Sequence, residues 1–112
     1  MANKLYKPIL IDSIKVAENI EKHRFIGFDG KHCQAGVKAF GVCDVETEKE
    51  QFAPIGVLGI FLVEAAENIT AGDKITSDAD GKAVKGSELE SINGYSLDTA
   101  ESGSLIRIVR GI

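Results

Sequence analysis

The stretch that decides the fold is Ala-Glu-Asn-Ile-Thr-Ala-Gly-Asp-Lys-Ile at residues 66–75, followed by Asp-Gly-Lys-Ala-Val at residues 80–84. An Asp-Gly pair between two short apolar segments is a strong hairpin signal, because the type I′ turn needs positive φ at both central positions. We therefore expect residues 73–76 and 82–84 to form the two strands of a hairpin that turns at Asp80-Gly81.

Four short motifs occur twice along the chain, in the same order. Their offsets are 49, 51, 53 and 52 residues, counted from residues 17 to 66, 29 to 80, 41 to 94 and 59 to 111. The pairs are Ala17-Glu18-Asn19-Ile20 with Ala66-Glu67-Asn68-Ile69, Asp29-Gly30-Lys31 with Asp80-Gly81-Lys82, Gly41-Val42 with Gly94-Tyr95, and Gly59-Ile60 with Gly111-Ile112. Self-similarity at a nearly constant period indicates an internal repeat.

The repeat predicts an all-β domain built from two related units of about 50 residues, with little helix. A length of 112 residues fits a single domain. We expect residues 1–12 to be an N-terminal arm or edge strand and residues 13–112 to be one β domain, with units at about 13–60 and 61–112. The 12 glycines, spread along the whole chain, agree with short strands and many turns.

The closing strands of the two units differ in charge. Residues 105–110 include two arginines in an apolar, β-branched run, which predicts a strand with one partly solvent-exposed face. Ile55–Val63 carries no charge, so we expect it to be buried on both faces, at the core centre or in a subunit interface. The core is the simpler of these two interpretations. A helix of one or two turns is indicated only at Gly86–Ile92.

Composition and charge exclude several classes of function. A net charge of −4 without a basic stripe argues against binding to phosphate backbones. The longest run of apolar residues and glycine, Ile55–Val63, has nine residues, whereas a membrane helix needs about 20. No charged-then-apolar leader opens the sequence, so we expect no secretion through a signal peptide. Two cysteines are too few for a disulfide scaffold.

The candidate catalytic and metal-binding side chains are histidines and cysteines. Adjacent strand residues point to opposite faces, so the neighbours His32 and Cys33 do not form a nucleophile–base pair by sequence alone. The repeat aligns Cys33 with Val84, which favours a buried thiol that packs like a small hydrophobic side chain. His23, His32, Cys33 and Cys43 could supply four zinc ligands, but their spacing matches no zinc pattern.

Asp78-x-Asp80-Gly81 resembles a calcium loop only in part. With Gly81 at the sixth position, the first and twelfth ligands would be Thr76 and Ser87, so turn chemistry is the better interpretation. No Gly-x-x-x-x-Gly-Lys-[Ser/Thr] phosphate loop occurs. We therefore predict no catalytic, cofactor-binding or metal-binding residue, and a binding or structural protein rather than an enzyme.

The order of the motifs at residues 66–75, 80–84, 94–100 and 102–109 resembles the small capsid cement, or decoration, proteins of tailed bacteriophages. In that family an Ile-x-x-Gly-Asp segment, an Asp-Gly-Lys hairpin and a Gly-x-x-Leu-x-x-Ala-x-x-Gly-x-x-Ile/Val-x-Val tail recur, often as two related halves. The resemblance extends from about residue 13 to residue 112. The first half departs from it, since Glu21-Lys22-His23 stands where the second half has Thr70-Ala71-Gly72.

This resemblance implies an all-β fold of the β-clip or small-barrel kind. It also implies a structural protein of the virion, made in the bacterial cytoplasm, that binds the major capsid protein as a trimer at three-fold positions outside an expanded head. We expect the N-terminal arm and Ile55–Val63 to make the subunit and capsid contacts. Neither a cofactor, nor nucleic acid, nor a membrane is expected as a partner.

Two alternatives remain open at this stage. One is a component of the phage tail or baseplate. The other is a β-clip module that binds a small ligand or carries biotin or lipoate. A carrier needs a modifiable lysine at a hairpin tip, and Lys31 and Lys82 both follow Asp-Gly, although neither is flanked by methionine.

Overall fold

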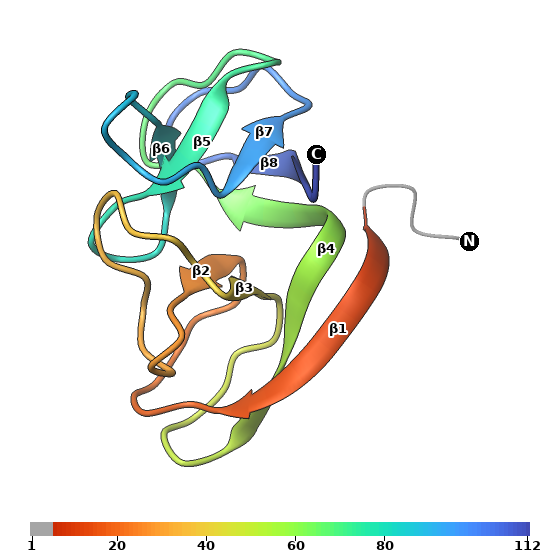
Figure 1. The fold of residues 1–112 in the computed structure, drawn as a ribbon, viewed down its shortest axis with the longest axis vertical. Helices are drawn as coiled ribbons and strands as arrows, with labels where there is room; N and C mark the ends of the chain where they lie inside the picture. The colour runs from red at the N-terminus through yellow and green to blue at the C-terminus, as the bar shows by residue number, and fades with distance from the viewer. Residues whose placement is uncertain (1–5) are drawn as a thin grey trace.

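The computed structural model describes residues 6–112, and all regular elements in this range are strands (Figure 1). The strands are β1 (Lys7–Lys15), β2 (Arg24–Ile26), β3 (Gly41–Cys43), β4 (Phe52–Glu64), β5 (Lys74–Ser77), β6 (Ala83–Lys85), β7 (Gly94–Ser96) and β8 (Leu105–Arg110). The all-β prediction is confirmed. The helical turns expected at Gly86–Ile92 are wrong, since this segment is a turn within irregular chain.

Among residues 6–112, no helix has the length and apolar character needed to span a bilayer. The first five residues of the predicted N-terminal arm lie outside the described part of the chain. The remainder of that arm forms most of β1, which continues beyond residue 12 to Lys15.

One sheet contains all eight strands, in the order β2-β3-β4-β8-β7-β5-β6, with β1 paired to β4 outside this path. Within this order, β2-β3-β4 and β5-β7-β8 are matching three-strand runs that meet where β4 pairs antiparallel with β8, and β6 extends the second run. The two ends of the sheet then approach one another. Phe25 N donates to Gly81 O at 2.7 Å, and Ala65 bridges to Ala83. The result is a nearly closed barrel (Figure 1).

The two Ala-Glu-Asn-Ile motifs make the same kind of contact in the two halves. Asn19 Oδ1 accepts a hydrogen bond from Lys49 N at 2.8 Å, and Asn68 Oδ1 accepts one from Ser102 N at 3.0 Å. Each asparagine, the third residue of its motif, thereby ties the motif to a loop 30 or 34 residues later. These matched contacts support the proposal that residues 13–60 and 61–112 are related units.

Both Asp-Gly segments form tight turns, but the predicted type I′ geometry is wrong. Gly30 and Gly81 have φ values of 79° and 76°, whereas Asp29 and Asp80 do not adopt positive φ. Gly81 N donates to Asp78 O at 3.3 Å, and Gly30 makes the matching bond. This is a turn followed by one left-handed glycine, the arrangement of three-residue hairpin loops. Only the second residue of each Asp-Gly pair therefore requires glycine.

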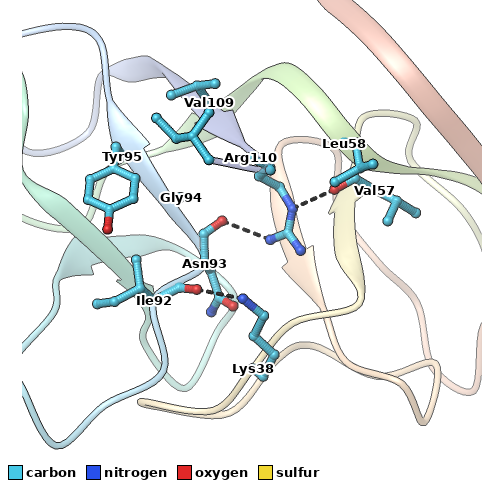
Figure 2. A pocket seen from close by; sticks show the side chains of 11 residues that line it. Lys38, Val57, Leu58, Ile92, Asn93, Gly94, Tyr95, Val109 and Arg110 are labelled. Carbon is cyan, nitrogen blue, oxygen red and sulfur yellow. Dashed lines mark hydrogen bonds between the residues drawn. The ribbon is translucent and has the colours of Figure 1, made fainter.

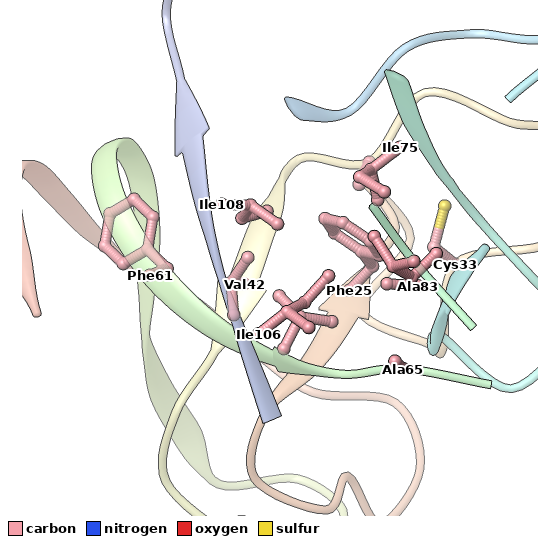
Figure 3. Close-up of a cluster of buried hydrophobic side chains, with 12 residues drawn as sticks. Phe25, Cys33, Val42, Phe61, Ala65, Ile75, Ala83, Ile106 and Ile108 are labelled. Atoms are coloured by element: carbon pink, nitrogen blue, oxygen red, sulfur yellow. The ribbon is translucent and has the colours of Figure 1, made fainter. Parts of the chain in front are cut away.

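The larger of two clusters of buried side chains draws on both halves of the chain (Figure 3). Phe25 on β2 packs with Ile75 on β5 and with Ile106 and Ile108 on β8, and all four are fully buried. A smaller cluster lies in the first half alone and comprises Val16, Ile20, Ile26, Cys43, Ala53 and Ile55. Because the larger cluster is shared, the two halves fold around a common core, which supports the proposal of a single β domain.

Burial along β4 alternates, so the prediction that Ile55–Val63 is buried on both faces is wrong. Phe61 and Val63 point into the core, while Leu58 is exposed and Val57 is half-buried. Apolar residues can line a half-exposed face when another surface is to cover it, and the absence of charge alone does not distinguish the two cases.

Gly59, with φ of 125°, lets the backbone of β4 approach that of β1 closely, because a Cβ there would lie 2.4 Å from Lys7 O.

Candidate assembly surface

Strand β1 is exposed along almost its whole length. Every residue of Lys7–Lys15 is exposed except Ile14, which is half-buried. Three consecutive apolar residues, Ile9, Leu10 and Ile11, are among them, and Ile9 is 82% exposed. A run of exposed apolar side chains on a strand is unusual and makes this strand a candidate contact surface for another molecule.

The backbone of β1 is also open on one side. Within residues 6–112, β1 pairs only with β4, from Lys7 opposite Ile60 to Lys15 opposite Phe52. Its other edge therefore presents amide and carbonyl groups without strand partners in the part of the chain that the structure describes. Such an edge can accept a strand from another chain.

A break in the register interrupts the alternation of side chains within the exposed apolar run of β1. The pairing shifts between Pro8 and Leu10, and again between Leu10 and Ile11. Ile9 has no partner in this register, so the strict alternation of the strand is lost there. Leu10 lies opposite Leu58 of β4, which is itself exposed. We call Ile9, Leu10, Ile11 and Leu58 together the apolar edge.

The structure thus places the two predicted contact segments side by side. Residues 7–15 of the N-terminal segment pair with residues 52–60 of β4, and this range includes much of Ile55–Val63. Sequence reasoning missed the register shifts at the apolar edge. The only signal in the sequence was three consecutive apolar residues, Ile9-Leu10-Ile11, where a half-buried strand would alternate.

His32, a candidate ligand or base, lies between two carboxylates. Its Nδ1 is 2.7 Å from Glu18 Oε2, and its Nε2 is 2.6 Å from Glu21 Oε2. Burial lowers the pKa of His32, but the hydrogen bonds to Glu21 and Glu18 outweigh burial and raise the pKa above its usual value. A protonated ring can donate from both nitrogens, so His32 acts as a clamp between the Ala-Glu-Asn-Ile motif and the first hairpin.

The two cysteine thiols are buried in an environment that keeps them protonated. Burial raises the pKa of Cys33 and of Cys43 above the ordinary thiol value. Cys33 Sγ donates to Val37 O at 3.2 Å, and Cys43 Sγ donates to Val45 O at 3.0 Å. A nucleophilic cysteine requires the thiolate, which this environment disfavours. The thiols pack as part of the two buried clusters.

Two further candidates, Asp78 and Lys82, have structural partners, whereas His23 Nδ1 is buried without a hydrogen-bond partner among the residues that the structure describes. Asp78 Oδ1 accepts hydrogen bonds from Asp80 N and Lys82 N, at 2.9 and 2.8 Å, which confirms the interpretation of Asp78-x-Asp80-Gly81 as turn chemistry. Lys82 Nζ lies 3.3 Å from Glu64 Oε2. Within residues 6–112, no group of three or more histidine, cysteine, aspartate or glutamate side chains is arranged to hold a metal ion.

Comparisons with known proteins identify one family model and a solved structure with a similar fold. A family model described as phage cement protein matches residues 8–111. The crystal structure of the head fiber gp8.5 N base in bacteriophage phi29 is similar over 91% of this chain and 93% of that chain, with a TM-score of 0.77 and 20% sequence identity. At that identity the likeness establishes the shared fold. A search of the curated proteins found no match.

Proposed function

The chain belongs to the phage cement protein family, and from this premise we propose that it binds the outside of a phage head and stabilises it. It is a structural protein associated with the phage capsid. In this proposal the protein's partners are the major capsid protein and further copies of the same chain, with which it forms a trimer at three-fold positions. The protein has no enzymatic activity in this role.

The observation that carries the proposal is the apolar edge. It combines exposed apolar side chains with a strand edge that is open in the described part of the chain. Full burial of an isoleucine or leucine side chain contributes about 1.5–3 kcal/mol, and an added strand satisfies the open backbone groups. Association with another polypeptide would therefore stabilise both partners.

Linking several such edges in one trimer would multiply their effect. A single edge of this size gives a weak contact. Once one edge of an oligomer is bound, the other edges bind as in an intramolecular reaction, so the avidity of the oligomer exceeds the affinity of each contact. A protein that bridges neighbouring capsid subunits in this way opposes their separation. No catalytic group is needed for that task, which agrees with the structural environment of His32 and of both cysteines.

The test is a double variant, Ile9→Lys with Ile11→Lys, compared with Leu89→Lys. Leu89 is the matched control, because it is 99% exposed but lies in the loop between β6 and β7. Oligomeric state is measured by light scattering, and binding by co-sedimentation with empty expanded heads of the same phage. We expect the double variant to lose trimerisation or head binding and the control to retain both.

Two results would contradict the proposal. In the first, the double variant, shown to be folded by circular dichroism, trimerises and sediments with heads as the unmodified protein does. In the second, the unmodified protein remains in the supernatant with expanded heads, which would favour a tail or baseplate role. A thermal or pressure challenge of decorated and bare heads then tests stabilisation, which predicts that decorated heads withstand the higher load.

A further inference from the structure

Arg110, the last residue of β8, turns its guanidinium group toward main-chain carbonyls. Its Nε donates to Val57 O at 2.9 Å, and Nη1 donates to Asn93 O at 2.8 Å (Figure 2). Its Nη2 donates to Ala39 O and Phe40 O at 3.3 and 3.4 Å. These carbonyls come from β4, from the loop before β7 and from the loop before β3. The side chain is therefore held in one position by distant parts of the chain.

The charge of Arg110 is not neutralised by these bonds. No carboxylate among residues 6–112 forms an ion pair with it. Burial lowers the pKa of Arg110 to about 10, which reflects the cost of holding the cation away from water. A half-buried cation bonded only to neutral groups, as Arg110 is, gains more from an added anion than an exposed cation does.

A second cation faces the same pocket. Lys38 Nζ donates to Ile92 O at 2.7 Å, and both residues line the pocket together with Arg110 (Figure 2). The pKa of Lys38 is lowered by burial and by the nearby charge of Arg110. Two like charges thus share one site, and no carboxylate of residues 6–112 forms an ion pair with either of them, in a protein whose net charge is −4.

The rest of the lining is largely apolar and reaches the apolar edge. Leu58, Val109 and Ile112 are among the lining residues, as is the half-buried Tyr95. Leu58 belongs to both surfaces, since it lies opposite Leu10 of β1. A partner that covers the apolar edge would therefore reach the mouth of the pocket.

We propose that this pocket binds the carboxylate of an aspartate or glutamate side chain that an apolar segment of a partner protein presents. The carboxylate would accept hydrogen bonds from the free Nη1–H of Arg110 and from Lys38, and the flanking apolar residues would contact Leu58 and Ile112. Charge-assisted hydrogen bonds of this kind are about twice as strong as neutral ones. The inference rests on the proposed function only in taking the partner to be another capsid component.

The experiment is a titration of the full chain, labelled with ¹⁵N, with acetyl-Leu-Glu-Leu-amide and with acetyl-Leu-Gln-Leu-amide. Both ends are blocked, so the glutamate side chain supplies the only carboxylate. We expect the backbone amide resonances of Lys38, Asn93 and Arg110 to shift. The glutamine peptide should bind at least about tenfold more weakly than the glutamate peptide. Lys38→Met should weaken binding of the glutamate peptide several-fold, whereas Lys49→Met, at an exposed position outside the pocket lining, should leave it unchanged.

Three outcomes would overturn the inference. They are no shift of the pocket amides at the highest peptide concentration, equal affinity for the two peptides, and tighter binding of inorganic phosphate than of the glutamate peptide. Lys38 is exposed, so its replacement is not expected to unfold the protein, whereas Arg110 holds four carbonyls and is left intact. The titration contains no capsids, so its failure is distinguishable from a failure of head binding.

Discussion

Replacing Gly81 by alanine should destabilise the protein more than replacing Gly103, although both glycines have a left-handed backbone. Their φ values are 76° and 89°. A Cβ on Gly81 would lie 2.5 Å from Phe25 O, about 0.9 Å short of ordinary contact, whereas a Cβ on Gly103 meets nothing within 4 Å. The comparison therefore separates the cost of the backbone conformation from the cost of the contact between the two halves.

The magnitudes follow from those two costs. A left-handed non-glycine residue costs about 1–2 kcal/mol, and both variants bear this cost. Gly81→Ala must in addition move the turn away from β2, which weakens the bond from Phe25 N to Gly81 O and the packing of the fully buried Phe25 ring. A hydrogen bond contributes about 0.5–1.5 kcal/mol. We expect a loss of about 1–2 kcal/mol for Gly103→Ala and about 2–4 kcal/mol for Gly81→Ala.

Urea unfolding followed by far-ultraviolet circular dichroism measures both losses, because the chain has no tryptophan to report by fluorescence. The two variants must show equal m-values, so that the shift of the midpoint reports stability alone. Equal destabilisation by the two substitutions would refute the reasoning, because it would mean that the close approach of Gly81 to β2 contributes nothing to the stability of the fold.

Two further predictions concern pH. His32→Gln removes a group whose pKa is raised in the folded protein, so the stability it contributes is fully present below its unfolded pKa of about 6.5 and is lost as pH rises through the folded pKa. The difference in urea midpoint between unmodified protein and variant should be largest below about pH 6.5 and should shrink as the pH rises above that value. A constant difference would contradict the role of the clamp with Glu18 and Glu21. Asp98→Asn removes a carboxylate whose pKa is lowered, first by its hydrogen bond from Arg107, so its contribution is present above its unfolded pKa and is lost as pH falls through the folded pKa. The midpoint difference for this variant should hold at neutral pH and vanish in acid, and persistence of the difference in acid would contradict the ion pair as its source.

The repeat motifs predicted local structure well, because their chemistry is local. Gly30 and Gly81 sit in equivalent left-handed positions, and only glycine adopts these without strain. The predicted type of turn was wrong because the sequence Asp-Gly fits more than one loop length. The hydrogen bonds of the flanking strands select among these loops. The prediction that β4 is buried on both faces was wrong for a related reason. A lack of charge shows that a face can be buried, but it does not show that another part of the protein covers that face.

The candidate surface was predictable in part. The N-terminal segment and Ile55–Val63 were expected to make contacts, and the pairing of β1 with β4 brings them together. The break in register at Ile9 depends on how two strands some 50 residues apart align, and the apolar run Ile9-Leu10-Ile11 is its only signal in the sequence. Arg110 was expected on a wet face, but its guanidinium is turned inward by carbonyls from three other segments.

The sequence by itself determined the all-β class, the positions of the turns and the absence of a recognisable catalytic motif, because turn propensity and alternation act over a few neighbouring residues. The tertiary structure alone decided that β4 and β8 join the two halves, that β1 lies along β4 with its apolar side chains uncovered, and that two cations share a pocket. Each of these features depends on contacts between residues far apart in the chain. Such contacts are fixed only when the whole sheet closes around its common core.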